Sequence, residues 1–166
     1  MTDDQEIYSL IESFEKKLPH FADGRIDYTH SDTAPVITVF ISFQEKVLLL
    51  KRSDKVLTYK GKWNTVAGYL DELKPIKEKV YEELSEELGI KKTDIKTIRI
   101  GESYTFTDTT AKKTWIVHPV NAELLHDTPI RLDWEHTEYR WIDPLDIDQF
   151  DTVPNAKVSL KRALHM

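Results

Sequence analysis

Acidic side chains gather near the end of the segment Gly68–Ile90. Glu82, Glu83, Glu86 and Glu87 fall within six residues in a stretch of helical character. Residues three and four apart lie side by side on a helix, so Glu83, Glu86 and Glu87 share one strip, where like charges repel. Carboxylates held together in this way suit Mg²⁺, Mn²⁺ or Ca²⁺ better than zinc. The sequence therefore predicts a divalent-cation site on this helix.

The same segment resembles the Nudix box, G-x5-E-x7-R-E-U-x-E-E-x-G-U, in which U is a bulky aliphatic residue. Seven of the nine fixed positions match over 23 residues. The two departures are Lys74, which stands where the family has Glu, and Glu82, which stands where it has Arg. The matching residues are Gly68, Glu83, Leu84, Glu86, Glu87, Gly89 and Ile90.

The two departures reverse the charges of the residues that they replace. In the family, this Glu and Arg can pair and so brace the turn that carries the metal ligands. We expect Lys74 and Glu82 to form the same pair with the signs exchanged, with Gly68 and Gly89 as the other structural positions. The alternative is an inactive Nudix domain that binds a nucleotide or a protein partner. Side chains that point apart would contradict the exchange.

The resemblance also implies roles for individual carboxylates. By position, Glu83, Glu86 and Glu87 are the expected ligands of Mg²⁺ or Mn²⁺, which neutralises phosphate charge and lowers the pKa of bound water. The resemblance implies that the general base is one of Glu83, Glu86 and Glu87, or a carboxylate from a loop. Residues 134–141, WEHTEYRW, resemble a segment of several Nudix enzymes and imply Glu135 as an additional ligand or base, with Glu138 in reserve.

Basic and aromatic residues are candidates for substrate binding. Arg52 and Lys62 lie in a stretch that looks like the lead-in to a Nudix box, and their charges complement phosphate. Each is alternatively an ordinary surface charge. Tyr104 and Phe106 share one face of the strand after the box. They are placed either to stack on a nucleobase or to pack in the core. His136 contacts substrate or is structural.

Composition limits the classes of function. The chain has 166 residues, a net charge of −6 and no cysteine. The charge disfavours nucleic acid polymers and anionic membranes as partners. The lack of cysteine excludes thiol nucleophiles and weighs against the isopentenyl diphosphate isomerases that share the fold. No signal peptide or membrane span is predicted. We expect a cytoplasmic monomer or homodimer that acts on a small nucleotide-type substrate.

Hydrophobic periodicity places these residues on helices and strands. The order of elements predicts an α/β protein, with a mixed α+β sheet in a Nudix-like α/β/α sandwich, and one Nudix domain over residues 1–166. The polar loops 20–34, 53–62 and 108–113 are expected to carry substrate specificity. Helices are expected at about 4–17, 75–88 and 155–164, strands at 36–43, 46–52, 63–70, 96–107, 114–124 and 138–142, and a helical turn at 144–150.

These observations together predict an Mg²⁺-dependent pyrophosphohydrolase. Its reaction would be hydrolysis of the diphosphate linkage in a nucleoside diphosphate derivative. Nucleoside triphosphates and dinucleoside polyphosphates are the first candidates.

Overall fold

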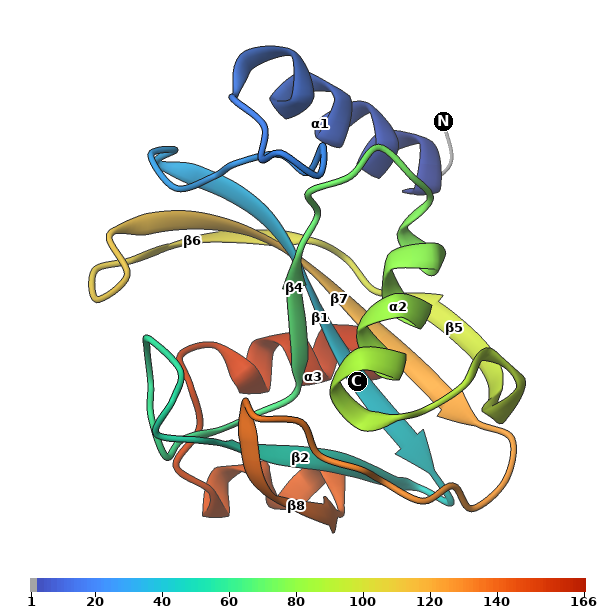
Figure 1. The fold of residues 1–166 in the computed structure, drawn as a ribbon. Coiled ribbons are helices and arrows are strands. Elements are labelled where there is room, and N and C mark those ends of the chain that lie inside the picture. The colour runs from blue at the N-terminus through green and yellow to red at the C-terminus, as the bar shows by residue number, and fades with distance from the viewer. Residues whose placement is uncertain (1–2) are drawn as a thin grey trace.

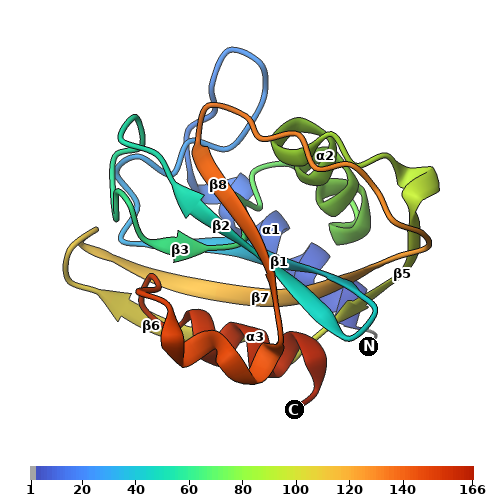
Figure 2. The same cartoon turned by 90° about the horizontal axis from the view of Figure 1, so that it is seen from below.

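Eight strands form one mixed sheet, and helices cover both of its faces (Figures 1 and 2). The computed structural model describes residues 3–166. The helices are α1 (Asp3–Lys17), α2 (Ile76–Leu88) and α3 (Ala156–Leu164), with 3-10 turns η1 (Lys92–Asp94) and η2 (Pro144–Gln149). The strands are β1 (Thr33–Phe43), β2 (Lys46–Arg52), β3 (Trp63–Asn64), β4 (Val66–Tyr69), β5 (Ile95–Ile100), β6 (Tyr104–Asp108), β7 (Lys113–Leu124) and β8 (His136–Ile142).

The layers follow the expected order. Figure 2 shows α3 on one face of the sheet and α1 and α2 on the other. Apolar residues of α1 and α2 pack with one face of β1 and β7, while α3 and η2 cover a second, smaller core on the opposite face. The predicted mixed sheet between layers of helices is confirmed.

Two long parallel strands, β1 and β7, form the middle of the sheet. Each of them also pairs with two other strands along different parts of its length. The first half of β1 pairs with β4, and its end turns into β2. In the same way, β7 pairs with β6 along its first part and with β5 along its last part. The strands β4, β1, β7 and β6 are therefore consecutive neighbours in the sheet.

The stretch 63–70, predicted as one strand, is two short strands. β3 pairs with β2, whereas β4 pairs with β1. Thr65 lies between them, and its hydroxyl donates to the carbonyl of Val39 on β1. The prediction of an unbroken strand was wrong, because a change of pairing partner leaves the alternation of side chains intact.

The stretch 96–107 is likewise two strands and not one. The chain leaves β5 after Ile100 and enters β6 at Tyr104. Gly101 lies at the break, where an added Cβ would come within 2.3 Å of the carbonyl oxygen of Arg162 in α3. Only glycine lets the backbone pass so close to this helix, and the break follows from that contact.

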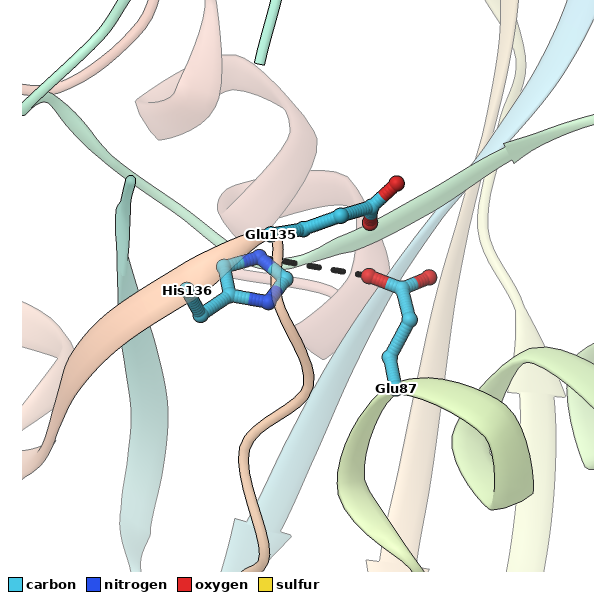
Figure 3. Close-up of side chains that lie close together, drawn as sticks. All are labelled: Glu87, Glu135 and His136. Carbon is cyan, nitrogen blue, oxygen red and sulfur yellow. Dashed lines mark ion pairs between the residues drawn. The ribbon is translucent and has the colours of Figure 1, made fainter. Parts of the chain in front are cut away.

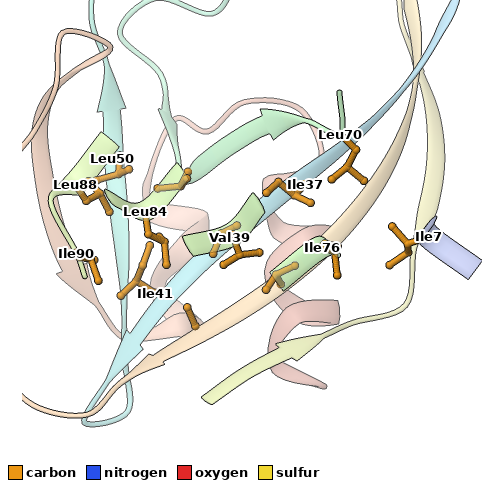
Figure 4. Packing of buried hydrophobic residues seen from close by; sticks show 14 of the residues in the cluster. Ile7, Ile37, Val39, Ile41, Leu50, Leu70, Ile76, Leu84, Leu88 and Ile90 are labelled. Carbon is orange, nitrogen blue, oxygen red and sulfur yellow. The ribbon is translucent and has the colours of Figure 1, made fainter. Parts of the chain in front are cut away.

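The apolar stripe of α2 packs on the sheet as its spacing predicts (Figure 4). Ile76, Val80, Leu84 and Leu88 are all at most 1% exposed. The helix ends at Gly89, which has a φ of 69°, a left-handed conformation that favours glycine. This packing fixes the rotation of α2 and therefore the direction in which its carboxylates point.

Two charged residues also lie on the buried side of α2. Lys79 and Glu87 are each 4% exposed. Together with Glu83 they repeat every four residues beside the apolar stripe, so the three side chains follow one row of the helix. Within residues 3–166, no helix is long and apolar enough to cross a membrane.

Candidate active site

The loop before β8 is docked on the C-terminal end of α2. The backbone N–H of Arg131 donates to the carbonyl of Leu88 at 3.0 Å, and that of Asp133 donates to the carbonyl of Glu87 at 3.2 Å. These bonds satisfy carbonyls that a helix end otherwise leaves free. As a result, Glu135 and His136 lie beside the Glu87 side chain (Figure 3).

The end of β2 holds the same loop from the other side. Ser53 donates its backbone N–H to the carbonyl of Glu135 and its hydroxyl to the carbonyl of Trp134, both at 2.8 Å. The position of Glu135 is thus set by backbone contacts with two elements that are distant in the sequence. The structure brings this residue, predicted from the downstream motif, to the carboxylates of α2.

Electrostatic repulsion is concentrated at Glu87. Burial, the charge of Glu135 and the neighbouring Glu83 carboxyl raise the pKa of Glu87 to about 11. Burial also raises the pKa of Glu83, and contacts with Glu87 and Lys79 offset this only in part. Oε2 of Glu87 is buried without a hydrogen-bond partner. A buried carboxylate oxygen without a partner is costly, and a bound cation would relieve that cost.

His136 is held in one orientation at this cluster. Its Nδ1 lies 3.2 Å from Oδ1 of Asp133, and its Nε2 lies 3.9 Å from Oε1 of Glu87. Burial lowers the pKa of His136, although the Asp133 charge opposes the shift. The lowered pKa favours the neutral ring, and the Asp133 carboxylate next to Nδ1 favours the tautomer that carries its proton on that nitrogen.

The donor set fits a divalent cation. Ligand atoms of Glu87, Glu135 and His136 all lie within 4.8 Å of one another. Carboxylate oxygens with one neutral imidazole suit Mn²⁺ as well as Mg²⁺. Of the three residues predicted from the box as ligands, Glu87 belongs to this group, whereas Glu83 and Glu86 line the adjoining cavity.

Gly68 lets β4 pass against the Glu83 carboxylate. An added Cβ at Gly68 would lie 2.8 Å from Oε1 of Glu83 and 2.9 Å from its Cδ. The box glycine is therefore explained by the closeness of this side chain and not by an unusual backbone conformation.

We expect Gly68→Ala to displace the Glu83 carboxylate and lower kcat/KM by about 10–100-fold, the usual effect of moving a supporting group. Thermal unfolding should change little, because the end of a flexible side chain can move. Gly101→Ala is the contrast, since its Cβ would meet backbone in α3, and it should unfold at lower temperature. Full activity of Gly68→Ala would contradict this role for the glycine.

A buried ion-pair group adjoins the cluster. Nζ of Lys79 lies 3.0 Å from Oδ1 of Asp71 and 3.3 Å from Oε1 of Glu83. Burial alone would lower the pKa of Lys79, but the Asp71 carboxylate, followed by Glu83 and Glu82, raises it above its usual value. Neither Lys79 nor Asp71 was predicted. The available signal was the spacing. Lys79 lies next to Val80 of the apolar stripe and four residues before Glu83, which predicts a lysine near the buried side of the helix and beside that carboxylate.

The ion pair expected between the two departures from the box is present. Nζ of Lys74 binds Oε2 of Glu82, and it also lies 3.3 Å from Oε1 of Glu72. The side chains do not point apart, so the exchange of signs keeps the attraction across the loop and the helix. Partly exposed pairs of this kind contribute less than about 1 kcal/mol.

A cavity of about 480 Å³ opens beside the carboxylates. Its floor is one face of the consecutive strands β4, β1, β7 and β6, and α3 closes one side. Charged residues that line it include Arg25, Arg52, Lys79, Glu83, Glu86 and Glu135, and aromatic ones are Tyr59, Tyr69, Tyr104, Phe106 and Trp115.

The floor of the cavity carries both aromatic residues that were candidates on the strand after the box, Tyr104 and Phe106. The rings of Tyr104 and Phe106 stack with centroids 6.1 Å apart, and both line the cavity. The hydroxyl of Tyr104 is 2.5 Å from Oγ of Ser159 in α3. Trp115 on β7 and Tyr69 on β4, whose ring centroids are 5.8 Å apart, extend this aromatic surface.

Each of the three loops expected to carry specificity supplies residues to the cavity. Arg25 comes from the first, Tyr59 from the second, and Asp108 begins the third. The Tyr59 hydroxyl donates to Oδ1 of Asp108 at 2.7 Å, which joins two of the loops. Burial acts to raise the pKa of Asp108, but the hydrogen bonds from Tyr59 and from backbone N–H groups outweigh it and keep the carboxylate charged.

Two basic candidates differ in their placement. Arg52 lines the cavity, and its Nε donates to the carbonyl of Thr58 at 2.9 Å. Lys62 is not among the lining residues, and its ammonium binds Asp151 at 2.8 Å. The reserve candidate Glu138 pairs with Arg140 on the exposed side of β8. The structure therefore does not bring Lys62 or Glu138 to the site.

A comparison with protein families identifies the class to which this fold belongs. The NUDIX domain family matches residues 32–163, and the chain belongs to this family. The expected class, a Nudix-type hydrolase, is thereby confirmed at the level of the family. The match begins after α1 and the segment that carries Arg25. A comparison with curated protein sequences gave no match.

Solved structures show the same fold at low sequence identity. A MutT protein from Methanosarcina mazei Go1 aligns with a TM-score of 0.66 and 24% identity, over 82% of this chain and 96% of that chain. An Ap4A hydrolase from C. elegans gives 0.60 and 18%, over 80% and 95%. The E. coli dihydroneopterin triphosphate pyrophosphohydrolase gives 0.62 and 19%, over 80% and 96%.

Proposed function

We propose that the protein is a divalent-metal-dependent hydrolase of the diphosphate linkage in a nucleoside diphosphate derivative. The observation that carries this proposal is the group of carboxylates, Glu83, Glu86 and Glu135, at the wall of a cavity with aromatic side chains on its floor. Acids clustered at a cavity suit metal and phosphate chemistry, and the aromatic surface suits a planar base.

The roles of the side chains follow from their positions. Glu87, Glu135, Glu83 and Glu86 hold Mg²⁺ or Mn²⁺, with His136 beside them. The ion, when bound, screens phosphate charge and makes water a better nucleophile at neutral pH. Glu135 takes a proton from the attacking water. That water forms a new bond to phosphorus while the bridging P–O bond breaks and its electrons stay on the leaving phosphate.

Two arginines favour a polyphosphate substrate. Arg52 lines the cavity near Glu135, and Arg25 lines it near Asp71. A guanidinium binds phosphate oxygens in a bidentate manner. Nucleoside triphosphates and dinucleoside polyphosphates both offer a planar base and several phosphates. Two of the structural relatives are named for Ap4A and dihydroneopterin triphosphate, compounds that share these two features.

The cellular setting is also part of the proposal. We propose that residues 1–166 act as one Nudix domain in the cytoplasm, as a monomer or homodimer. The net charge of −6 supports a small substrate and not a nucleic acid polymer.

The test is a panel of nucleoside triphosphates, dinucleoside polyphosphates, ADP-ribose and nucleotide sugars with Mg²⁺ or Mn²⁺. We expect phosphate or pyrophosphate release for at least one class, lost in Glu83→Gln/Glu87→Gln and in EDTA. Nucleotide binding without turnover across the whole panel would replace this proposal with that of an inactive binding domain.

A further inference from the structure

Lys79 places a charged nitrogen inside the row of carboxylates on α2. Its side chain is 5% exposed. The ammonium lies between two carboxylates of different elements, Asp71 after β4 and Glu83 on α2. Oε1 of Glu72 is 3.9 Å away. Three acidic side chains therefore surround one buried cation at the edge of the cavity.

The position of this ammonium divides the acidic cluster into two parts. At one end, Glu87, Glu135 and His136 converge, and Glu87 has an oxygen without a hydrogen-bond partner. At the other end, Nζ of Lys79 lies 3.0 Å from Oδ1 of Asp71 and 3.3 Å from Oε1 of Glu83. An ammonium and a divalent ion compete for the same carboxylate oxygens, since both need them to offset burial.

We propose that Lys79 is a built-in cation that holds Glu83 against Asp71 and keeps a divalent ion out of that pair of carboxylates. Divalent ions then bind only at the Glu87 end of the cluster, to which Glu83 contributes the oxygen that does not face Lys79, Oε2. Lys79 is a positioning residue and not a catalytic one. This inference rests on the proposed metal-dependent function and deepens it, because it assigns the part of the cluster at which the ions bind.

Lys79 also bears on the position of the Nudix box at which this chain has Glu instead of Arg. Glu82 stands at the position that carries Arg in the Nudix box, and its carboxylate forms an ion pair with Lys74. Lys79 lies one helical turn before Glu83 and contacts it directly. A positive charge next to Glu83, the glutamate that follows the Arg position of the box, is thus supplied by another residue of α2, at a position that the box leaves free.

The experiment counts Mn²⁺ ions bound per chain, by the electron paramagnetic resonance signal of free Mn²⁺ during titration. Lys79→Met keeps an unbranched side chain that is one atom shorter and removes its charge. We expect it to bind one more Mn²⁺ than the unmodified protein, whereas Lys79→Arg keeps the original count. Lys77→Met, at an exposed position on the same helix, is the matched control and should not change the count.

A second variant tests the proposal if Lys79→Met does not fold. In the unmodified protein Asp71 binds Lys79 and not a metal, so Asp71→Asn should leave the count and affinity for Mn²⁺ unchanged. A loss of one ion in Asp71→Asn, or an equal count in Lys79→Met and the unmodified protein, would overturn the inference.

The proposed function fails in a different way. If the unmodified protein binds no Mn²⁺ and hydrolyses nothing, that function is wrong. A new site in Lys79→Met would then still support the role of the lysine, and its absence would overturn that as well.

Discussion

Replacing Glu87 with Gln is expected to abolish metal-dependent hydrolysis and, at the same time, to stabilise the metal-free protein. Glu87 is the carboxylate at which burial and repulsion from Glu135 and Glu83 converge. Changing the partners of metal ligands typically costs about 10–100-fold in activity, and we expect the loss of this ligand to cost more. Steady-state kinetics with Mg²⁺ and Mn²⁺ measure this effect.

The gain in stability follows from the direction of the pKa shift. The folded-state pKa of Glu87, about 11, is above the ordinary value of 4.5. Between these values the folded chain keeps a proton that the unfolded chain releases, so the free energy of unfolding falls as pH rises, by about 1.4 kcal/mol per pH unit. Glutamine does not titrate, so the advantage of the variant in EDTA should grow from about pH 5 to about pH 8.

The control for this experiment is Glu78→Gln, an exposed acid on the same helix. It should leave both activity and the pH dependence of unfolding unchanged. If urea unfolding of metal-free Glu87→Gln shows the same slope with pH as the unmodified protein, the Glu87 carboxylate is not the strained group.

Glu135→Gln is expected to lower kcat by about 10²–10⁴-fold, the range for loss of a general base. The fold should persist, because Glu135 is held through its backbone carbonyl, which Ser53 binds and glutamine retains. Steady-state kinetics with Mg²⁺ and Mn²⁺ measure the effect.

Glu138→Gln is the matched control in the same segment, since Glu138 binds Arg140 outside the cavity. It should behave as the unmodified protein. An equal loss of kcat in Glu138→Gln, or unchanged activity in Glu135→Gln, would move the role of base to a carboxylate of α2.

The exposed loops and the cavity together suggest where specificity resides. Arg25 belongs to the segment before the family match, and Tyr59 and Asp108 join two loops at the cavity. The expectation that these loops carry specificity therefore depends on how the loops meet at the cavity, which the sequence of a single loop does not contain.

The sequence by itself determined the sandwich and most of the carboxylate cluster. The apolar residues of α2 recur every four positions, and burial of that stripe sets the direction of the carboxylates beside it. The spacing of the box led to Glu83, Glu86 and Glu87, and the downstream motif led to Glu135. Periodicity and motifs could predict these features because each depends on residues that are close together in the chain.

Only the tertiary structure decided which of these groups meet. Asp71 and Lys79 lie on different elements, and their contact depends on how β4 and α2 pack together. The breaks at Thr65 and Gly101 depend on a change of strand partner and on the approach of α3. Lys62 and Arg52 are both basic residues in the segment before the box, and the sequence does not distinguish them. In the structure, Asp151 binds Lys62 outside the cavity. Such contacts join residues far apart in the chain, and spacing along the sequence does not encode them.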